Sequence, residues 1–180
     1  MVEIVSVPLS LDDLAAAELQ EMLAYWQGLA RDRVAPSWHE VEPLEMPAKL
    51  LPYLTVVEVH QSPLDFVYVF YGTGHLALKA RDLTGHSIND TLPNENCSIV
   101  FEQYRRTLEA RKPMAFRRRV TDTDMATEPT QTTLRLPLSA DGETINWIMS
   151  LSDLRGSPEM RGFYQTYGRE RPFRALAAAR

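Results

Sequence analysis

The spacing of apolar residues divides the chain into a helical part and a strand part. In residues 11–33 apolar side chains recur every three or four positions, which predicts a helix with one apolar face. Between Thr55 and Tyr71 the period falls to two, which predicts an antiparallel hairpin of strands 55–60 and 65–71. Both segments therefore have an apolar face to bury.

The second strand of that hairpin is apolar on both faces. Its side chains alternate between one set, Phe66, Tyr68 and Phe70, and the opposite set, Val67, Val69 and Tyr71. A strand of this kind is covered on both sides. We expect the domain core on one side and the N-terminal helix or a second subunit on the other.

The rest of the chain alternates between short helices and strands. The predicted elements are a short helix from Gly72 to about Ala80, a helix over 99–110, and strands over 114–121, 130–139 and 144–152, with a turn at Asp141-Gly142. Strands joined by hairpins form an antiparallel sheet, and helices grouped between the second and third strands indicate the α+β class.

This pattern divides the chain into three parts. Residues 1–35 form an N-terminal amphipathic helix that serves as a cap or for dimerisation, and residues 36–154 form the central domain. Residues 155–180 form a basic C-terminal tail, with aromatic anchors at Phe163, Tyr164, Tyr167 and Phe173.

Composition narrows the class of protein. The net charge of −5 gives no reason to expect nucleic-acid binding. The single cysteine, Cys97, cannot form an internal disulfide. No secretion signal is recognisable, and no apolar stretch approaches the ~20 residues that span a bilayer. We therefore expect a cytoplasmic protein that does not insert into a membrane.

Several short motifs occur in an order typical of one family. They are Leu50–Leu54 before the first hairpin strand, Gly72-Thr73-Gly74 after the second, Asp82–Gly85 after the short helix, and Leu136–Ser139 with Asp141-Gly142 between the last two strands. With Trp26 and Pro36, this order resembles a PAS domain over residues 20–154, in the subfamily of small stand-alone bacterial PAS proteins.

The resemblance implies a PAS-like five-stranded antiparallel sheet of order 2-1-5-4-3, with helices on one face and an added N-terminal helix. It also implies signalling through ligand sensing or protein contacts. The chain departs from the family at Val67 and Val69, where typical members carry arginine.

Catalytic motifs are missing from the sequence. It contains no Gly-x-Ser-x-Gly and no identifiable pair of nucleophile and base, so we expect no enzymatic activity. The alternative is an isomerase or dehydratase on a cone-shaped α+β sheet. That function requires a buried Asp or His facing the cavity, and a structure with His60, His75 or Asp65 buried close together in a cleft would favour it.

Cofactor and metal signals are weak. Gly72-x-Gly74-x-x-Ala77 matches the letters of the dinucleotide fingerprint without its βαβ unit, so we interpret it as a tight turn where glycine permits a positive φ. The four histidines lack metal-ligand spacing, so we expect no metal and no cofactor. The alternative is a flavin sensor, or a haem sensor with His75 as the iron ligand.

The run Arg117-Arg118-Arg119 is the one concentrated cationic site. On a strand, Arg118 points away from its two neighbours and toward the core. In one interpretation Arg118 pairs with an anionic ligand in the cleft, while Arg117, Arg119 and Arg135 form an outer patch for an anion or partner. In the other, the arginines protect an exposed edge strand from aggregation.

The remaining candidate site is a cavity between the helices and the sheet, where a PAS arrangement leaves room for a small molecule. The residues expected to face it are Tyr68, Phe70, Phe101, Tyr104, Phe116, Arg118, Leu134, Leu136 and Trp147. An apolar core has the same composition, so a ligand pocket and a filled core both stay open.

Together these features predict a single-domain PAS regulator that contacts other signalling proteins, with or without gating by a small ligand. We expect a homodimer formed through residues 11–30 and strand 65–71. The apolar helix face and the two-sided strand are the basis for that expectation.

Overall fold

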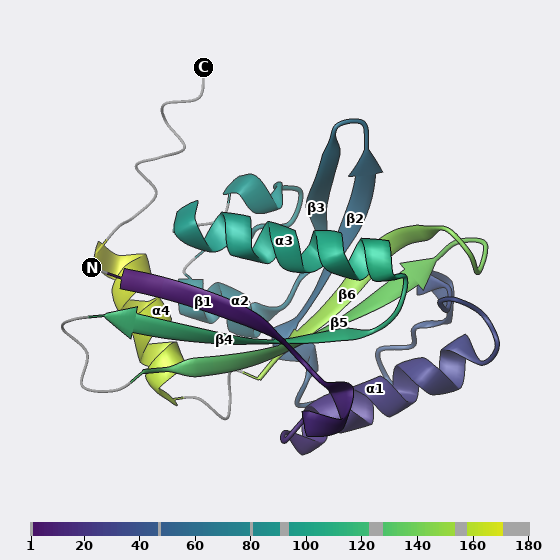
Figure 1. The fold of residues 1–180 in the computed structure, drawn as a ribbon, viewed down its shortest axis with the longest axis horizontal. Helices are drawn as coiled ribbons and strands as arrows, with labels where there is room; N and C mark the ends of the chain where they lie inside the picture. The colour runs from purple at the N-terminus through teal and green to yellow at the C-terminus, as the bar shows by residue number, and fades with distance from the viewer. Residues whose placement is uncertain are drawn as a thin grey trace.

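A computed structural model describes residues 2–46, 48–79, 81–90, 94–122, 128–153 and 158–170. Within these residues the chain forms one six-stranded antiparallel sheet and four α-helices, which confirms the α+β class (Figure 1). The strands are β1 (Val2–Leu9), β2 (Leu54–Gln61), β3 (Leu64–Tyr71), β4 (Met114–Asp122), β5 (Thr130–Ser139) and β6 (Ile145–Ser152). The helices are α1 (Ala17–Ala30), α2 (Thr73–Lys79), α3 (Asn94–Ala110) and α4 (Pro158–Glu170).

The strand order is β1-β4-β5-β6-β2-β3. The five predicted strands have the neighbours that were expected of them, but the prediction of a five-stranded sheet is wrong by one strand. The additional strand, β1, pairs with β4 from Val2 to Leu9 and covers the edge that β4 would otherwise expose. Because β1 is itself an edge strand, it accommodates Pro8.

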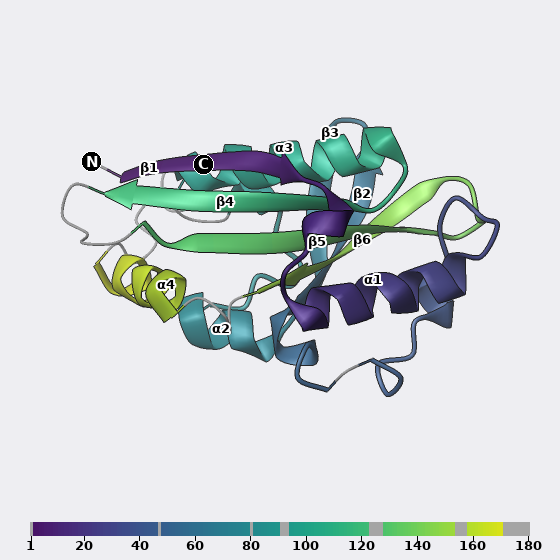
Figure 2. The same ribbon diagram turned by 60° about the horizontal axis from the view of Figure 1, so that its bottom comes forward.

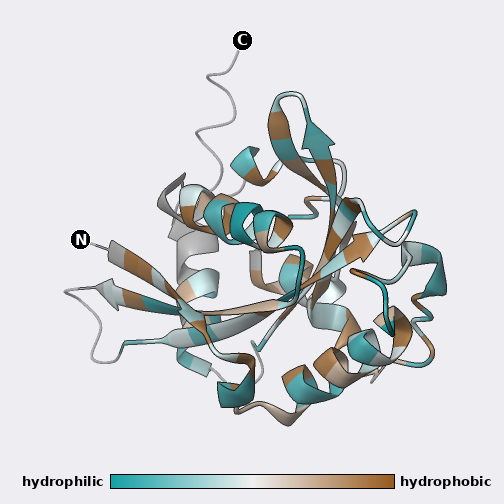
Figure 3. Ribbon diagram, turned by 45° about the vertical axis from the view of Figure 1, so that its right-hand side comes forward, coloured by the Kyte–Doolittle hydropathy of each residue, from teal (hydrophilic) through white to brown (hydrophobic). Residues whose placement is uncertain are grey.

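The first helix begins later than predicted. Residues Leu11–Asp13 form a separate 3-10 turn, and α1 starts at Ala17. The apolar face of α1 buries Leu19, Met22, Trp26 and Ala30, and Figure 3 shows apolar positions alternating with polar ones along this helix. Helical spacing therefore identified the correct face but not the helix start.

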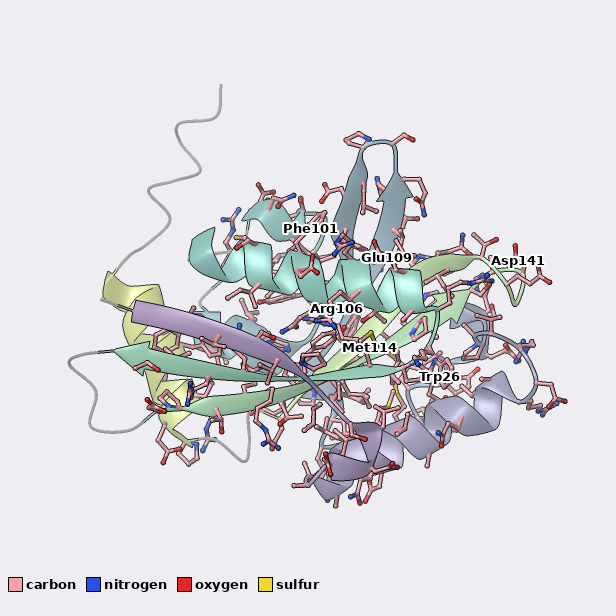
Figure 4. The ribbon with its side chains drawn as sticks, viewed as in Figure 1. Trp26, Phe101, Arg106, Glu109, Met114 and Asp141 are labelled. Carbon is pink, nitrogen blue, oxygen red and sulfur yellow. The ribbon has the colours of Figure 1, made fainter. Side chains whose placement is uncertain are left out.

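Trp26 anchors α1 to the sheet. Its Nε1 donates a hydrogen bond to the carbonyl oxygen of Pro137 on β5, at 2.7 Å, and both groups are buried. Figure 4 shows Trp26 between α1 and the strands, and Figure 2 shows α1 and α3 on opposite sides of the sheet. The sheet is thus covered on both faces, α1 lying on one and α3 on the other.

Two rows of residues on β5 show how the two covered faces differ. Leu134, Leu136 and Leu138 are fully buried in the main hydrophobic core together with the inner face of α1. The alternate row, Gln131, Thr133 and Arg135, is buried as well, on the side of α3. The face on the side of α3 therefore combines burial with polarity.

The predicted C-terminal tail is wrong in part, because residues Pro158–Glu170 form α4. Met160, Phe163 and Tyr164 of this helix pack against Leu78 of α2 and Val120 of β4 in a second, smaller core. Figure 2 shows α2 and α4 next to each other. The other two predicted anchors, Tyr167 and Phe173, lie outside the described side chains. No helix among the described residues is long and apolar enough to cross a membrane.

Candidate functional site

A small polar cavity lies between α3 and the sheet. Its volume is about 40 Å³, and residues from β2 to β6, from α2 and α3, and from α4 line it. By the ~10–15 Å³ that one buried water needs, it has room for about three water-sized groups. Among the described residues that line it there is no aspartate or glutamate.

Strand register brings the polar residues of β4, β5 and β6 to this cavity. Arg118 on β4 lies directly opposite Gln131 on β5, and Thr133 lies opposite Ser152 on β6. Arg135 lies opposite Ser150. Directly opposed residues share a face of the sheet, so all of these side chains point toward α3.

Arg135 is 5 % exposed and its guanidinium group is held by neutral partners only. Nη1 donates to Ser150 Oγ at 2.9 Å, and Nη2 donates to Gln103 Oε1 on α3 at 2.7 Å. The guanidinium carbon lies 3.7 Å from the centre of the Tyr104 ring, a cation–π contact. Its Nε is buried without a hydrogen-bond partner among the described residues.

The second arginine of the cavity, Arg118, is 7 % exposed. Its Nη2 donates to Gln131 Oε1, and its guanidinium carbon lies 5.4 Å from the centre of the Tyr164 ring of α4. Burial and the nearby positive charge of Arg135 lower the pKa of Arg118 to about 10. Two like charges therefore share one buried site.

A β-bulge places Tyr71 at the cavity. The pairing of β2 with β3 shifts between Val56 and Val57, so that Val69 has no directly opposed residue. This extra residue reverses the alternation. Tyr71 consequently turns inward, against Tyr68 at 5.1 Å between ring centres, while Phe70 turns outward. The prediction that Phe70 faces the cavity and Tyr71 faces away is therefore wrong.

Burial raises the pKa of both tyrosines of β3. Tyr68 and Tyr71 are accordingly neutral phenols, which can donate a hydrogen bond. The hydroxyl of Tyr71 has no hydrogen-bond partner among the described residues. It is thus a second unpartnered polar atom in the cavity, beside Nε of Arg135.

His75 lines the cavity from α2. It is 6 % exposed, and its Nε2 lies 3.0 Å from the carbonyl oxygen of Tyr53, to which it donates. The cavity is far below the ~300–1,000 Å³ of typical cofactor and ligand pockets. A haem therefore does not fit beside His75 as the side chains are arranged here.

The turn before His75 explains the two glycines of the Gly-x-Gly sequence. Neither Gly72 nor Gly74 has a positive φ; the described glycines that do are Gly85 and Gly142. A Cβ on Gly72 would instead lie 2.5 Å from the carbonyl oxygen of Pro52 and 2.7 Å from that of Leu54. The prediction of positive φ is wrong, and close backbone packing is the reason for glycine here.

Three of the nine predicted cavity residues line the cavity, namely Tyr68, Tyr104 and Arg118. Leu134 and Leu136 are in the core on the side of α1, and Trp147, opposite Leu138, shares that face. The expectation placed these three on the wrong face, because Arg135, on the other face of β5, was assigned to an outer patch.

The other predicted aromatic residues lie near the cavity without lining it. Phe101 packs edge-on against Phe66, with 5.2 Å between ring centres. Phe116 lies under Arg106, which extends from α3 toward β4 (Figure 4), and it lines a neighbouring open hollow of about 290 Å³.

The arginine run behaves as the strand alternation predicted, with Arg118 buried and Arg117 and Arg119 exposed. The assignment of Arg135 to the outer patch is wrong, since Arg135 lies in the cavity with Arg118. The edge-protection interpretation is wrong too, because β1 covers β4. Sequence reasoning thus missed Arg135, Gln131 and Thr133 as cavity residues, although their alternation along β5 was visible in the sequence.

Of the three residues named for the alternative enzyme, His75 is buried and lines the cavity, whereas His60 and Asp65 do not join it there. His60 is exposed and lies 3.0 Å from Glu58, and Asp65 accepts hydrogen bonds from Ser87 and from the backbone of Phe66. Neither is among the described residues that line the cavity.

Cys97 is buried and donates from Sγ to the Asn89 carbonyl. No group of three metal-ligating side chains occurs in the described part of the chain.

The fold and the site together define a small domain in which helices cover a small polar cavity against an antiparallel sheet. The family model for the PAS domain matches residues 14–151, most of the chain, and the protein belongs to that family. It is therefore a module of the sensor and signalling type. No curated protein matches the chain.

Proposed function

We propose that this chain is a cytoplasmic, single-domain PAS sensor of the small stand-alone bacterial type, gated by a small molecule in the cavity under α3. The observation that carries this proposal is the small polar cavity itself. Two buried polar atoms, Arg135 Nε and Tyr71 Oη, point to a missing partner, because buried polar groups are normally hydrogen-bonded.

A ligand in the cavity would change the contacts that hold α4 against the sheet. Tyr164 of α4 donates from Oη to Gln131 Oε1 at 3.0 Å, and its ring lies beside the Arg118 guanidinium. A ligand that draws Arg118 or Gln131 toward itself alters both contacts. The position of α4, and of the chain that follows it, then reports the state of the cavity to a partner protein.

Protein contact would involve the outer surface of β3. Val69 and Phe70 are 40 % and 39 % exposed on this edge strand. The apolar stripe of residues 11–30, by contrast, is largely used against the chain's own sheet. Of the two predicted dimer segments, β3 therefore offers the larger exposed apolar surface for a second copy or a signalling partner.

We propose no catalytic role. Among the described residues of the cavity, His75 is the only imidazole, and no carboxylate is present to act with it as an acid or base. Of the hydroxyl groups in or next to the cavity, that of Thr133 is hydrogen-bonded to Ser152 and that of Ser150 accepts from Arg135, while that of Tyr71 has no partner among the described residues.

The gating proposal can be tested by blocking the cavity. Val100 lines it from α3, so Val100→Phe fills the space, whereas Val7→Phe adds the same side chain at a position on β1 that is 49 % exposed. A panel of small positive, neutral and negative compounds is tested by thermal unfolding. We expect at least one compound to raise the Tm of the wild type and of Val7→Phe but not of Val100→Phe. Equal responses in all three proteins would contradict the proposal.

The contact proposal can be tested by mass in solution. Phe70→Glu places a charge on the exposed part of β3, and Val7→Glu places one at a comparably exposed site on β1. We expect a dimer for the wild type and Val7→Glu and a monomer for Phe70→Glu in native mass spectrometry. A dimer in all three proteins, or a monomeric wild type, would rule out this surface.

A further inference from the structure

We propose that the cavity binds a small carboxylate, with its oxygens between Arg118 and Arg135. This inference rests on the proposed function, since it names the chemical class of the molecule that gates the sensor.

The charge of the cavity favours an anion. The partners of Arg135 are an amide oxygen, a hydroxyl and an aromatic ring, none of which carries a negative charge. The described lining residues supply no carboxylate. The pKa of Arg118 is lowered because burial and the positive charge of Arg135 both disfavour its charged form. A bound anion would offset both effects.

The unpartnered atoms favour an oxygen acceptor. Arg135 Nε is a donor only, and the neutral hydroxyl of Tyr71 can donate. Both residues are more than nine-tenths buried and line the cavity. Carboxylate oxygens accept such bonds, and guanidinium groups pair with them in a geometrically specific way. A cation would find no compensating charge among the described residues here.

The size and the mixed walls favour a short organic acid. A volume of about 40 Å³ accommodates about three or four non-hydrogen atoms on the scale of one water per ~10–15 Å³. Val100 and the ring of Tyr68 supply apolar surface to the same cavity. A carboxylate with a one-carbon tail matches both features, whereas an aromatic acid exceeds the space.

The guanidinium of Arg135 is held in place before any ligand binds. Gln103 fixes it from α3 and is itself bound through Nε2 to Ser6 Oγ of β1, at 2.8 Å. Ser150 accepts from Arg135 and donates to the hydroxyl of Tyr104 at 3.2 Å. Such preorganisation lowers the ordering cost of binding.

The experiment measures binding by saturation-transfer NMR in chloride buffer at constant ionic strength. The probes are formate, acetate and benzoate, with acetamide as the uncharged isostere of acetate. Each probe is titrated against the wild type, Arg135→Met and Arg117→Met, the last removing an exposed arginine from the neighbouring strand. We expect formate and acetate to bind, acetamide to bind at least about tenfold more weakly, and benzoate not to bind.

The variants separate this inference from the proposed function. We expect Arg135→Met to lose acetate binding and Arg117→Met to retain it. Acetamide binding as tightly as acetate, in a wild type that responds to the panel above, would overturn the anion assignment and leave the sensor proposal intact. If no probe binds and Val100→Phe responds to the compound panel like the wild type, the anion assignment and the sensor proposal both fail. The comparison of acetate with acetamide uses the wild type alone, so it holds even if Arg135→Met does not fold.

Discussion

Gly72 lies at the junction of β3 and α2, between the two cavity residues Tyr71 and His75. Its amide donates to the carbonyl oxygen of Leu54 at 2.9 Å. A Cβ at this position would meet three backbone oxygens, those of Pro52, Leu54 and Leu51, at 2.5–2.8 Å. Backbone oxygens cannot rotate away as a side chain can, so Gly72→Ala must displace the η3 turn (Leu51–Tyr53) from α2.

The expected cost of Gly72→Ala is about 3 kcal/mol of unfolding free energy, at the upper end of the ~1–3 kcal/mol typical of overpacked sites. Gly28→Ala is the matched control, because nothing lies within 4 Å of its added Cβ on α1. Replacing a helical glycine by alanine should raise the free energy of unfolding by about 0.5–1 kcal/mol.

Urea unfolding followed by tryptophan fluorescence measures both variants, since the chain has three tryptophans. The two substitutions should move the midpoint in opposite directions. If Gly72→Ala unfolds within about 0.5 kcal/mol of the wild type, a value usual for neutral surface changes, the close-approach explanation of this glycine is refuted.

Three further substitutions test single contacts. Trp26→Phe removes the bond to Pro137, and should cost about 2 kcal/mol in urea unfolding; an unchanged midpoint would contradict this. Tyr164→Phe removes the bond to Gln131, and should cost about 1 kcal/mol while leaving secondary structure by circular dichroism unchanged. Backbone N–H donation from Glu143 and Thr144 holds the pKa of Asp141 below its usual range. That stabilisation is present above about pH 4 and is lost as the pH falls, so Asp141→Asn should destabilise at pH 7 and progressively less below pH 4.

The parts of the fold that follow from local periodicity could be predicted from the sequence. The strand at 130–139 was predicted at its observed bounds, and the Asp141-Gly142 turn is present with Gly142 at φ +86°. Strand β1 was missed because residues 2–9 depend on pairing with β4, which lies more than a hundred positions away in the chain. Local signals do not report such a partner.

The cavity could be predicted only in part. Tyr68, Tyr104 and Arg118 follow from alternation and from the position of α3. Tyr71 was missed because a bulge reverses the alternation, and no residue type in β3 marks that bulge. Arg135 was missed because a polar row in a half-apolar strand normally faces water. Here both faces are covered, and the exception to the usual pattern coincides with the candidate site.

We propose that a ligand bound in the cavity changes the contacts of α4 with the sheet. Amide hydrogen exchange of residues 158–165, with and without saturating acetate, tests it most directly. We predict slower exchange in this segment and in residues 100–107 of α3 when acetate is present, and no change in Arg135→Met. If saturating acetate slows exchange in α3 but leaves α4 unchanged, α4 does not respond to the cavity.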